Sequence, residues 1–197
     1  MAKTIKYDRQ EVISKATNLY WEKGFHGTSM RNLQDVIDMR PGSIYATFGS
    51  KEGLYKEALH CYANNGVAQL KKCAQSDTSP ITALKVFISN AIIGSAESAP
   101  SGMCMLVKTI SELTEENAEL LNEAKHLLNV MEQAFTAVLV QAQACGELDK
   151  NKDAAALARY LQVQLMGLRT YMRVNNDKMQ IEAFIDDIFA KEFSQVK

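Results

Sequence analysis

The sequence contains little proline and glycine, and it has no long apolar run. Only 3 of its 197 residues are proline and 10 are glycine. A chain with many β-turns needs more of both, so long helices are favoured. No stretch approaches the roughly 18–20 apolar residues of a membrane-spanning helix, and the polar start, MAKTIKYDRQ, differs from a signal peptide. We therefore expect a soluble, cytoplasmic, all-α protein.

Cysteine and histidine are too sparse for a recognisable metal site. The four cysteines lie at positions 61, 73, 104 and 145 and the three histidines at 26, 60 and 126, with no CxxC pair and no ligand spacing. Isolated thiols of this kind are typical of reduced cysteines in the cytosol. We expect no metal, no cofactor and no disulfide framework.

Neither sign of charge dominates the whole chain, whose net charge is −1. The first 53 residues, however, hold eight Lys and Arg residues against six Asp and Glu residues, which gives them a charge of +2 and leaves −3 for the rest. This small bias permits nucleic-acid binding by the N-terminal part but does not establish it.

Capping residues and apolar spacing predict two short helices before residue 40. Asp8 and Glu11 form a capping-box pattern at the start of the first helix, and Gly24 ends that helix. Thr28 is the predicted N-cap of the second helix. Four side chains of the second helix are expected to face inward: Met30, Leu33, Val36 and Ile37.

A third helix is predicted for residues 41–48 and is only about two turns long. Pro41 suits a first helical position, and Ile44 and Phe48, four residues apart, can anchor one face to a core. Three short helices that end in such a segment describe a helix-turn-helix, whose last helix enters the major groove of DNA. The outer face then carries Ser43, Tyr45, Ala46 and Thr47.

The side chains of this segment suit contacts with DNA. Gly42 lets the backbone approach a duplex closely, and Ala46 can contact a thymine methyl group. Tyr45 and Lys51 suit phosphate, while Arg40 lies beside the helix N-terminus, which itself attracts phosphate. A solvated surface helix rich in Ser, Thr and Tyr is the plain alternative.

The run GFHGTSMRNLQDVIDMRPGSIYATFGSKEGLY, residues 24–55, resembles the DNA-binding domain of TetR-family transcriptional repressors. The resemblance implies a three-helix helix-turn-helix domain at residues 1–50 and a six-helix effector-binding and dimerisation domain at residues 51–197. It also implies a homodimer that is not an enzyme, binds a palindromic double-stranded operator and is released by a small molecule. The segment departs from many relatives, which carry a second aromatic residue at the position of Thr47.

The resemblance assigns roles residue by residue. It assigns phosphate contacts to Thr28, Tyr45 and Lys51, and groove contacts to Arg40, Ser43 and Thr47. The complete set of predicted DNA contacts is Thr28, Arg31, Arg40, Pro41, Gly42, Ser43, Tyr45, Ala46, Thr47 and Lys51.

Three further helices are predicted at about residues 80–96, 115–145 and 153–174, with Ser79, Thr114 and Asp153 as their N-caps. The last of these helices is apolar on more than one face. A helix with one solvent-exposed side needs only one apolar face, so we expect the second apolar face to contact a partner subunit. The predicted dimer interface comprises Leu161, Leu165, Gly167, Leu168, Ile181, Ile185, Ile188 and Phe189.

The candidate effector pocket draws side chains from several C-terminal helices. Methionine adapts to irregular apolar cavities, although ordinary core packing is the alternative for each Met and Phe. The candidates are Phe87, Asn90, Gly94, Cys104, Lys108, Met131, Phe135, Gln164 and Tyr171.

Three other functions remain open at this stage. Cys104 follows a helix break in SGMCMLV, where a helix N-terminus favours the reactive thiolate, so a regulator that senses oxidants or electrophiles is one. The second is an all-α enzyme that uses this thiol, although the sequence shows neither a catalytic triad nor paired carboxylates. The third is a helical scaffold with an inactive DNA-binding head.

Overall fold

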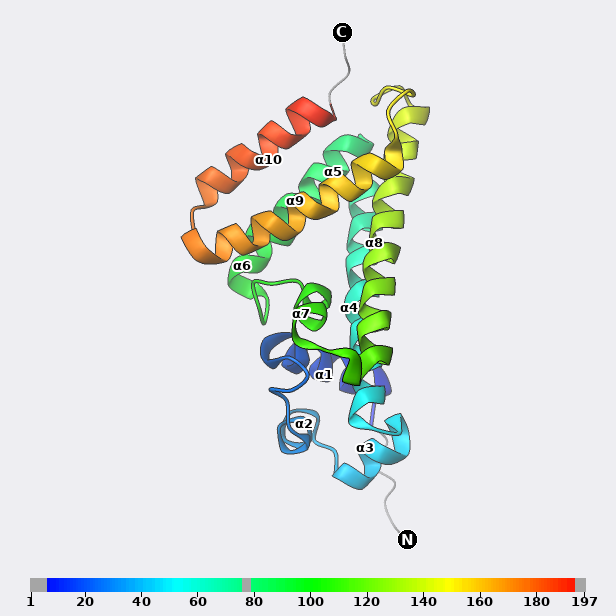
Figure 1. The fold of residues 1–197 in the computed structure, drawn as a ribbon, viewed down its shortest axis with the longest axis vertical. Coiled ribbons are helices and arrows are strands. Elements are labelled where there is room, and N and C mark those ends of the chain that lie inside the picture. Colours follow the sequence, from blue (N-terminus) through cyan, green and yellow to red (C-terminus); the bar gives the residue numbers. More distant parts are fainter. Residues whose placement is uncertain (1–6, 76–78, 194–197) are drawn as a thin grey trace. The chain divides into compact units, whose positions relative to one another are not determined.

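The computed structural model describes residues 7–75 and 79–193, with all of their side chains except those of residues 97 and 98. Within these ranges the chain forms helices joined by turns and no β-strand, which confirms the predicted all-α class (Figure 1). Each described helix is either too short or too polar to cross a lipid bilayer. The predicted N-terminal charge includes Lys3 and Lys6, which lie outside the described residues.

Packing divides the chain into two compact units. The first combines residues 1–62 with residues 105–127, and the second combines residues 63–104 with residues 128–197. Two long helices, α4 (Lys51–Ala74) and α8 (Ala118–Ala144), contribute residues to both. The domain boundary expected after residue 50 remains a prediction, because the first unit also contains a later segment of the chain.

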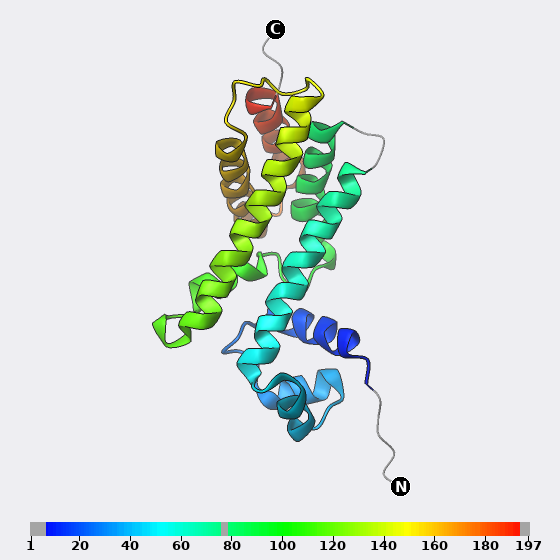
Figure 2. The same ribbon diagram turned by 90° about the vertical axis from the view of Figure 1, so that its right-hand side faces the viewer.

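The first unit contains the three short N-terminal helices. Besides the start of α4 and of α8 its elements are α1 (Arg9–Lys23), α2 (Met30–Ile37), α3 (Pro41–Phe48), α7 (Met105–Glu112) and the 3-10 turn η2 (Glu115–Asn117). Figure 2 shows α2 and α3 lying together beside α1. Aromatic rings fill the centre of this unit: the ring centroids of Tyr20 and Tyr55 are 4.6 Å apart, and those of Phe25 and Tyr55 are 5.0 Å apart.

Helix starts in the first unit follow the predicted chemistry with one shift. The carboxylate of Asp8 accepts hydrogen bonds from the backbone N–H groups of Gln10 and Glu11, as an N-cap does. The N-cap of α2 is Ser29 and not Thr28, because Ser29 and Asn32 form a reciprocal capping box. The prediction for Thr28 was therefore wrong by one residue.

One inward-facing residue of α2 was also predicted wrongly. Leu33 and Ile37, four residues apart, are buried, whereas Val36 is 40% exposed. In a helix of eight residues only one narrow stripe reaches the core. Val36 lies off that stripe and on the outer surface.

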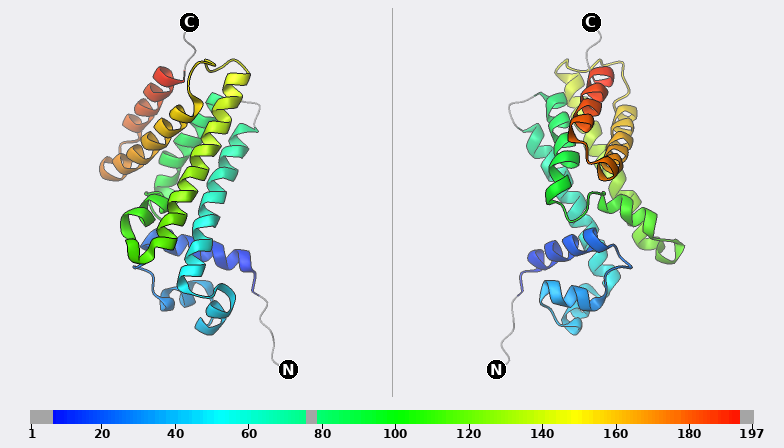
Figure 3. Two further views of the ribbon diagram at one scale, coloured as in Figure 1. Left: turned by 45° about the vertical axis from the view of Figure 1, so that its right-hand side comes forward. Right: turned by 90° about the vertical axis from the view of Figure 1, so that its left-hand side faces the viewer.

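The second unit is a bundle of longer helices. Besides the rest of α4 and α8 it contains α5 (Pro80–Ser89), η1 (Asn90–Gly94), α6 (Ser95–Ser98), α9 (Ala154–Asn175) and α10 (Lys178–Glu192). In Figure 3, α9 and α10 lie as neighbours joined by a short turn, and α10 also packs against α5. The buried core of this bundle includes Leu84, Phe87, Ile88, Ile92, Phe135, Leu139, Leu161, Leu168, Ile181, Ile185 and Phe189.

The helices of this unit largely match their predicted starts. Ser79 accepts a hydrogen bond from the N–H of Thr82 at the start of α5, and Asp153 caps α9. The helix predicted for residues 80–96 is present, but residues 90–94 adopt a π-helical turn. The long helix expected from residue 115 begins at residue 118, because a 3-10 turn precedes it and Thr114 forms no side-chain cap.

Candidate functional site

The turn between α2 and α3 has helix-turn-helix geometry. Three residues connect the two helices, and the first of them, Asp38, adopts a left-handed conformation with φ of 53°. Its N–H donates to the carbonyl of Gln34 at 3.0 Å and closes α2. Met39 is buried and anchors the turn, while Arg40 is extended and begins α3. Two short helices joined in this way are typical of DNA-binding proteins.

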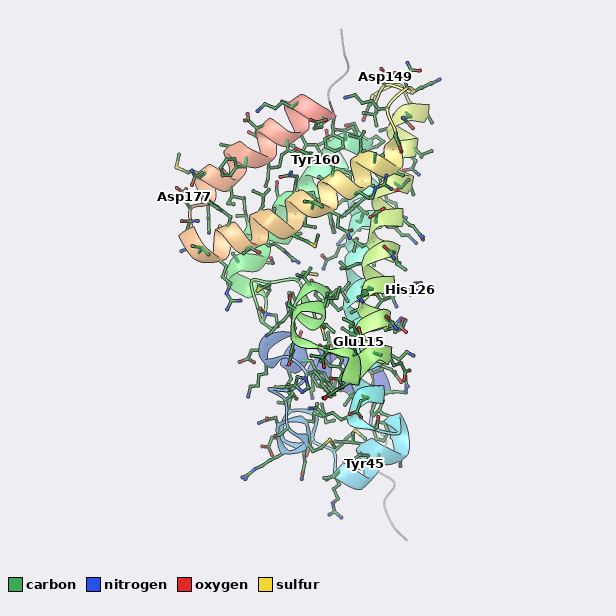
Figure 4. All side chains as sticks on the ribbon, in the orientation of Figure 1. Tyr45, Glu115, His126, Asp149, Tyr160 and Asp177 are labelled. Carbon is green, nitrogen blue, oxygen red and sulfur yellow. The ribbon has the colours of Figure 1, made fainter. Side chains whose placement is uncertain are left out.

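The third helix buries one face and exposes the other. Ile44 is fully buried and Phe48 is 8% exposed, so these two side chains fix α3 to the unit, as the sequence predicts. Tyr45, labelled in Figure 4, is 49% exposed. Ser43 and Ala46 are exposed with it. The outer face is therefore available to a large ligand.

The start of α3 has an open backbone. Arg40, Pro41 and Gly42 are all exposed, and Arg40 forms no side-chain hydrogen bond that caps the helix. A Cβ atom built on Gly42 would meet nothing within 4 Å. The first turn of a helix carries unpaired N–H groups and a partial positive charge, which favour a phosphate.

Tyr7 joins the outer face of α3, which the sequence did not indicate. Its phenol oxygen lies 2.5 Å from the hydroxyl oxygen of Thr47. The hydroxyl of Thr47 donates its proton to the carbonyl of Ser43 at 2.8 Å. The phenol must therefore donate to Thr47, because each hydroxyl has one proton. An exposed aromatic ring thus stands beside Thr47, although it comes from Tyr7 and not from α3 itself.

Two residues predicted to contact phosphate, Thr28 and Lys51, instead donate hydrogen bonds to backbone carbonyls of the first unit. The hydroxyl of Thr28 is buried and donates to the carbonyl of Gly24 at 2.7 Å. The ammonium of Lys51 donates to the carbonyl of Phe25 at 2.6 Å and lies 4.2 Å from the centroid of the Phe25 ring. Desolvation by burial lowers the pKa of Lys51. Arg31, by contrast, is exposed in the first turn of α2.

A carboxylate from α7 holds the turn between α1 and α2. One oxygen of Glu112 accepts from the N–H of Phe25 at 3.1 Å, and the other accepts from the N–H of His26 at 2.7 Å. Gly24 ends α1 with φ of 80°, and a Cβ atom there would collide with this carboxylate. Glycine is therefore required at position 24 both for its conformation and for space.

Lys108 also contacts the end of α1. Its ammonium donates to the carbonyls of Trp21 and Glu22 at 3.2 and 2.7 Å, at the end of α1, where the helix dipole favours a cation. It lies in the first compact unit, whereas the other pocket candidates lie in the second. One turn of α7 thus supplies a cation and an anion to the same segment.

The remaining pocket candidates stay a prediction, and they differ in how deeply they are buried. Phe87 and Phe135 are buried with ring centroids 5.8 Å apart, which is ordinary core packing. Tyr171 is 37% exposed, and its hydroxyl donates to the side chain of Gln180 at 2.8 Å. Of the others, Cys104, Met131 and Gln164 are half-buried, while Asn90 and Gly94 are exposed. Among the described residues no three His, Cys, Asp or Glu side chains are grouped to hold a metal.

The predicted dimer residues fall mainly on the inner faces of α9 and α10. Five of the eight are buried in the core of the chain's own second unit: Leu161, Leu168, Ile181, Ile185 and Phe189. Leu165 and Ile188 are half-buried, and only Gly167 is exposed. The exposed apolar side chains of the two helices are instead Tyr160 (labelled in Figure 4), Val163, Tyr171, Val174, Met179 and Phe184.

Two family descriptions match the chain. Residues 12–58 match bacterial regulatory proteins of the tetR family, and residues 80–188, more than half of the chain, match the tetracyclin repressor-like C-terminal domain. The HTH-type transcriptional repressor ComR of Escherichia coli is 26% identical over 165 residues, which are 82% of this chain and 78% of ComR. The uncharacterized HTH-type transcriptional regulator YezE of Bacillus subtilis is 24% identical over 94% of this chain and 96% of its own.

Solved structures share the fold. The TetR family transcriptional regulator CifR, as a cysteine mutant complexed with 26bp double-strand operator DNA, superimposes with a TM-score of 0.84 and 22% identity. The match covers 96% of this chain and 99% of that one. A TetR transcriptional regulator from Chloroflexus aurantiacus gives a TM-score of 0.80 at 19% identity, over 95% of this chain and 96% of its own.

Replacing Glu112 with Gln is expected to loosen the turn after α1. Glutamine has one carbonyl oxygen, so one of the two backbone N–H groups at Phe25 and His26 loses its acceptor. We expect the free energy of unfolding to fall by about 1–2 kcal/mol, measured by urea denaturation, and amide exchange at Phe25 and His26 to accelerate. Glu116→Gln, at an exposed position nearby, is the control. Unchanged amide exchange in Glu112→Gln would contradict the role of this carboxylate.

Proposed function

Because the chain belongs to the TetR family of bacterial regulatory proteins, we propose that it is a homodimeric transcriptional repressor. It binds a palindromic operator in the cytoplasm, where the chromosome lies, and a small-molecule effector releases it. The observation that carries the proposal is the α2–α3 pair, in which Ile44 and Phe48 fix a short helix whose other face is exposed. The function is recognition and not catalysis.

The outer face of α3 supplies two kinds of contact. Its first turn, with Arg40 and Ser43, is placed to reach base edges, since the start of a recognition helix enters the groove first. Tyr45 supplies an exposed hydroxyl group that can donate to a phosphate oxygen, whereas the Tyr7 hydroxyl is engaged with Thr47 and leaves only its ring beside the duplex. Arg31 adds an exposed cation on α2. Phosphate contacts position the protein, whereas base contacts determine which operator it selects.

The outer face of α9 and α10 is the proposed dimer interface. Val163 is 58% exposed and Val174 is 76% exposed, while the Tyr171 and Phe184 rings stack edge to face at 5.7 Å between the two helices. Gly167 is exposed on the same face and allows close approach of a second helix. A two-fold axis through such a face generates two identical reading helices, which is why the operator is palindromic.

Release by an effector requires a difference in affinity between two conformations. A ligand shifts an equilibrium only when it binds one state more tightly than the other. Helix α4 contributes residues to both compact units, so it is the proposed element that communicates binding in the second unit to the first. The contacts of Glu112 and Lys108 on the end of α1 stabilise the first unit during this change.

A gel-shift titration with DNA from upstream of the protein's own gene tests the function. We expect a complex with two subunits per palindrome, with affinity falling ~10³-fold or more between about 50 and 200 mM salt. Arg40→Ala and Ser43→Ala are expected to change which base substitutions are tolerated. If no palindromic fragment is bound, including fragments from neighbouring genes, the repressor function fails. If both variants weaken all sequences equally, α3 does not read bases through these residues.

Gly42→Ala separates DNA contact from folding. The added Cβ meets nothing within 4 Å, so stability is expected to stay constant or rise by up to about 1 kcal/mol. The operator affinity is expected to fall about tenfold or more, which corresponds to about 1.4 kcal/mol, because the methyl group holds the backbone away from the duplex. Gly102→Ala, which also has open space at its Cβ, is the control for both measurements. Wild-type affinity in Gly42→Ala would show that the backbone does not approach DNA there.

Val163→Arg is expected to convert the dimer into a monomer. Val163 is 58% exposed in the single chain, so the substitution leaves the core intact but places a charge inside the proposed interface. Sedimentation velocity measures the mass, and the gel shift should show loss of the two-subunit complex. Val140→Arg on α8, where the valine is 51% exposed, is the matched control. If Val140→Arg dissociates the dimer and Val163→Arg does not, the interface lies on α8 and not on α9.

A further inference from the structure

The second unit contains a single buried polar side chain among its described residues. This is Gln162 on α9, which is 8% exposed. Its amide nitrogen, Nε2, donates to the carbonyl of Leu128 on α8 at 3.2 Å. Its amide oxygen, Oε1, is buried and accepts no hydrogen bond from the part of the chain that the structure describes.

The orientation of this amide is fixed by its neighbour. The carbonyl of Leu128 can only accept a hydrogen bond, so the NH₂ group of Gln162 must face α8. The oxygen is thereby directed away from Leu128. An unpaired buried acceptor destabilises the folded state, and such groups are retained where a ligand or water completes them.

Partly buried apolar side chains lie one turn from the Gln162–Leu128 contact, and the ion pair between Arg159 and Glu132 joins the same two helices. Leu165 lies one turn along α9 and Met131 lies one turn along α8 from Leu128, and both side chains are only partly buried against the core. The terminal methyl group of Met131 occupies the space above Gly66, 2.7 Å from where a Cβ would lie. A flexible side chain over a glycine can move aside for a small molecule.

An irregular backbone segment lies against the same helix. The segment η1 packs against α9, and the Nε of Arg169 donates to the carbonyl of Ala91 within it at 2.8 Å. Side chains on η1, including Ile93, are partly buried against the core. π-helical turns inside α-helices occur frequently at functional sites.

We propose that Gln162 anchors the effector, and that the effector is an uncharged, largely apolar molecule that donates one hydrogen bond to Oε1 through a hydroxyl or N–H group. An anion would be repelled by the amide oxygen. A cation would lack a counterion, because no carboxylate is buried among the described residues of this unit. The inference rests on the proposed function, since it names the ligand class to which the repressor responds.

Matched pairs of small probes test the ligand class on the full-length protein. Indole is compared with N-methylindole, and 4-ethylphenol with 4-ethylanisole, by isothermal titration calorimetry. Methylation removes the donor and leaves the apolar body. We expect the donor of at least one pair to bind about fivefold or more tightly than its methylated counterpart. Gln162→Met, which preserves length, is expected to remove this preference, whereas Gln133→Met, at an exposed position of α8, retains it.

The outcomes separate this proposal from the repressor function. Binding of neither donor, or a donor preference that persists in Gln162→Met, overturns the proposal. Gln162→Met is also expected to raise the unfolding temperature by about 2–4 °C by removing the unpaired oxygen, and a lowered temperature would overturn the anchoring role in favour of a structural one. Operator binding by Gln162→Met should equal that of the wild type. If no form of the protein binds an operator, the repressor function fails, but the calorimetric titrations still show whether Gln162 binds a hydrogen-bond donor.

Discussion

The two hydrogen bonds that Glu112 accepts from the turn after α1 constrain the whole N-terminal unit. They fix the N–H groups of Phe25 and His26, while Lys108 and Lys51 occupy carbonyls of the same segment. Side chains therefore bind both the N–H groups and the carbonyl groups of the backbone between α1 and α2. Because α2 leaves directly from this turn, the charged groups at Glu112, Lys108 and Lys51 act together with the buried Ile44 and Phe48 in holding α3 in place.

Local structure was predictable because its causes are local. A capping side chain acts within three residues of its helix start, as at Asp8, Ser79 and Asp153. The error at Thr28 has the same origin, since Thr28 and Ser29 are adjacent and both can cap. Only the reciprocal bond with Asn32 distinguishes them. The α3 face was predicted correctly because Ile44 and Phe48 are its only large apolar anchors.

Contacts between distant residues could not be predicted in this way. Nothing in the sequence joins Tyr7 to Thr47 or Lys108 to the end of α1, and Lys108 was predicted to line the effector pocket. The faces of α9 posed a different difficulty. Both are apolar, so periodicity reveals that two surfaces are needed but not which one meets the chain's own core. Burial of Leu161 and exposure of Val163 distinguish them.

The π-helical turn at Asn90–Gly94 has a consequence for the evolution of this fold. Such a turn holds one residue more than a regular helix of the same span and arises when a residue is inserted without disturbing the helix on either side. Deleting one residue from a regular α-helix would rotate the chain beyond it by about 100° about the helix axis. In this segment the π-helical turn already holds an extra residue, so a deletion can be absorbed by restoring the regular helix. Length variants among related chains should therefore concentrate in this segment, where the helix has already accommodated an insertion. They should avoid α3, because an insertion or deletion in its eight residues would move Ile44 and Phe48 off one face.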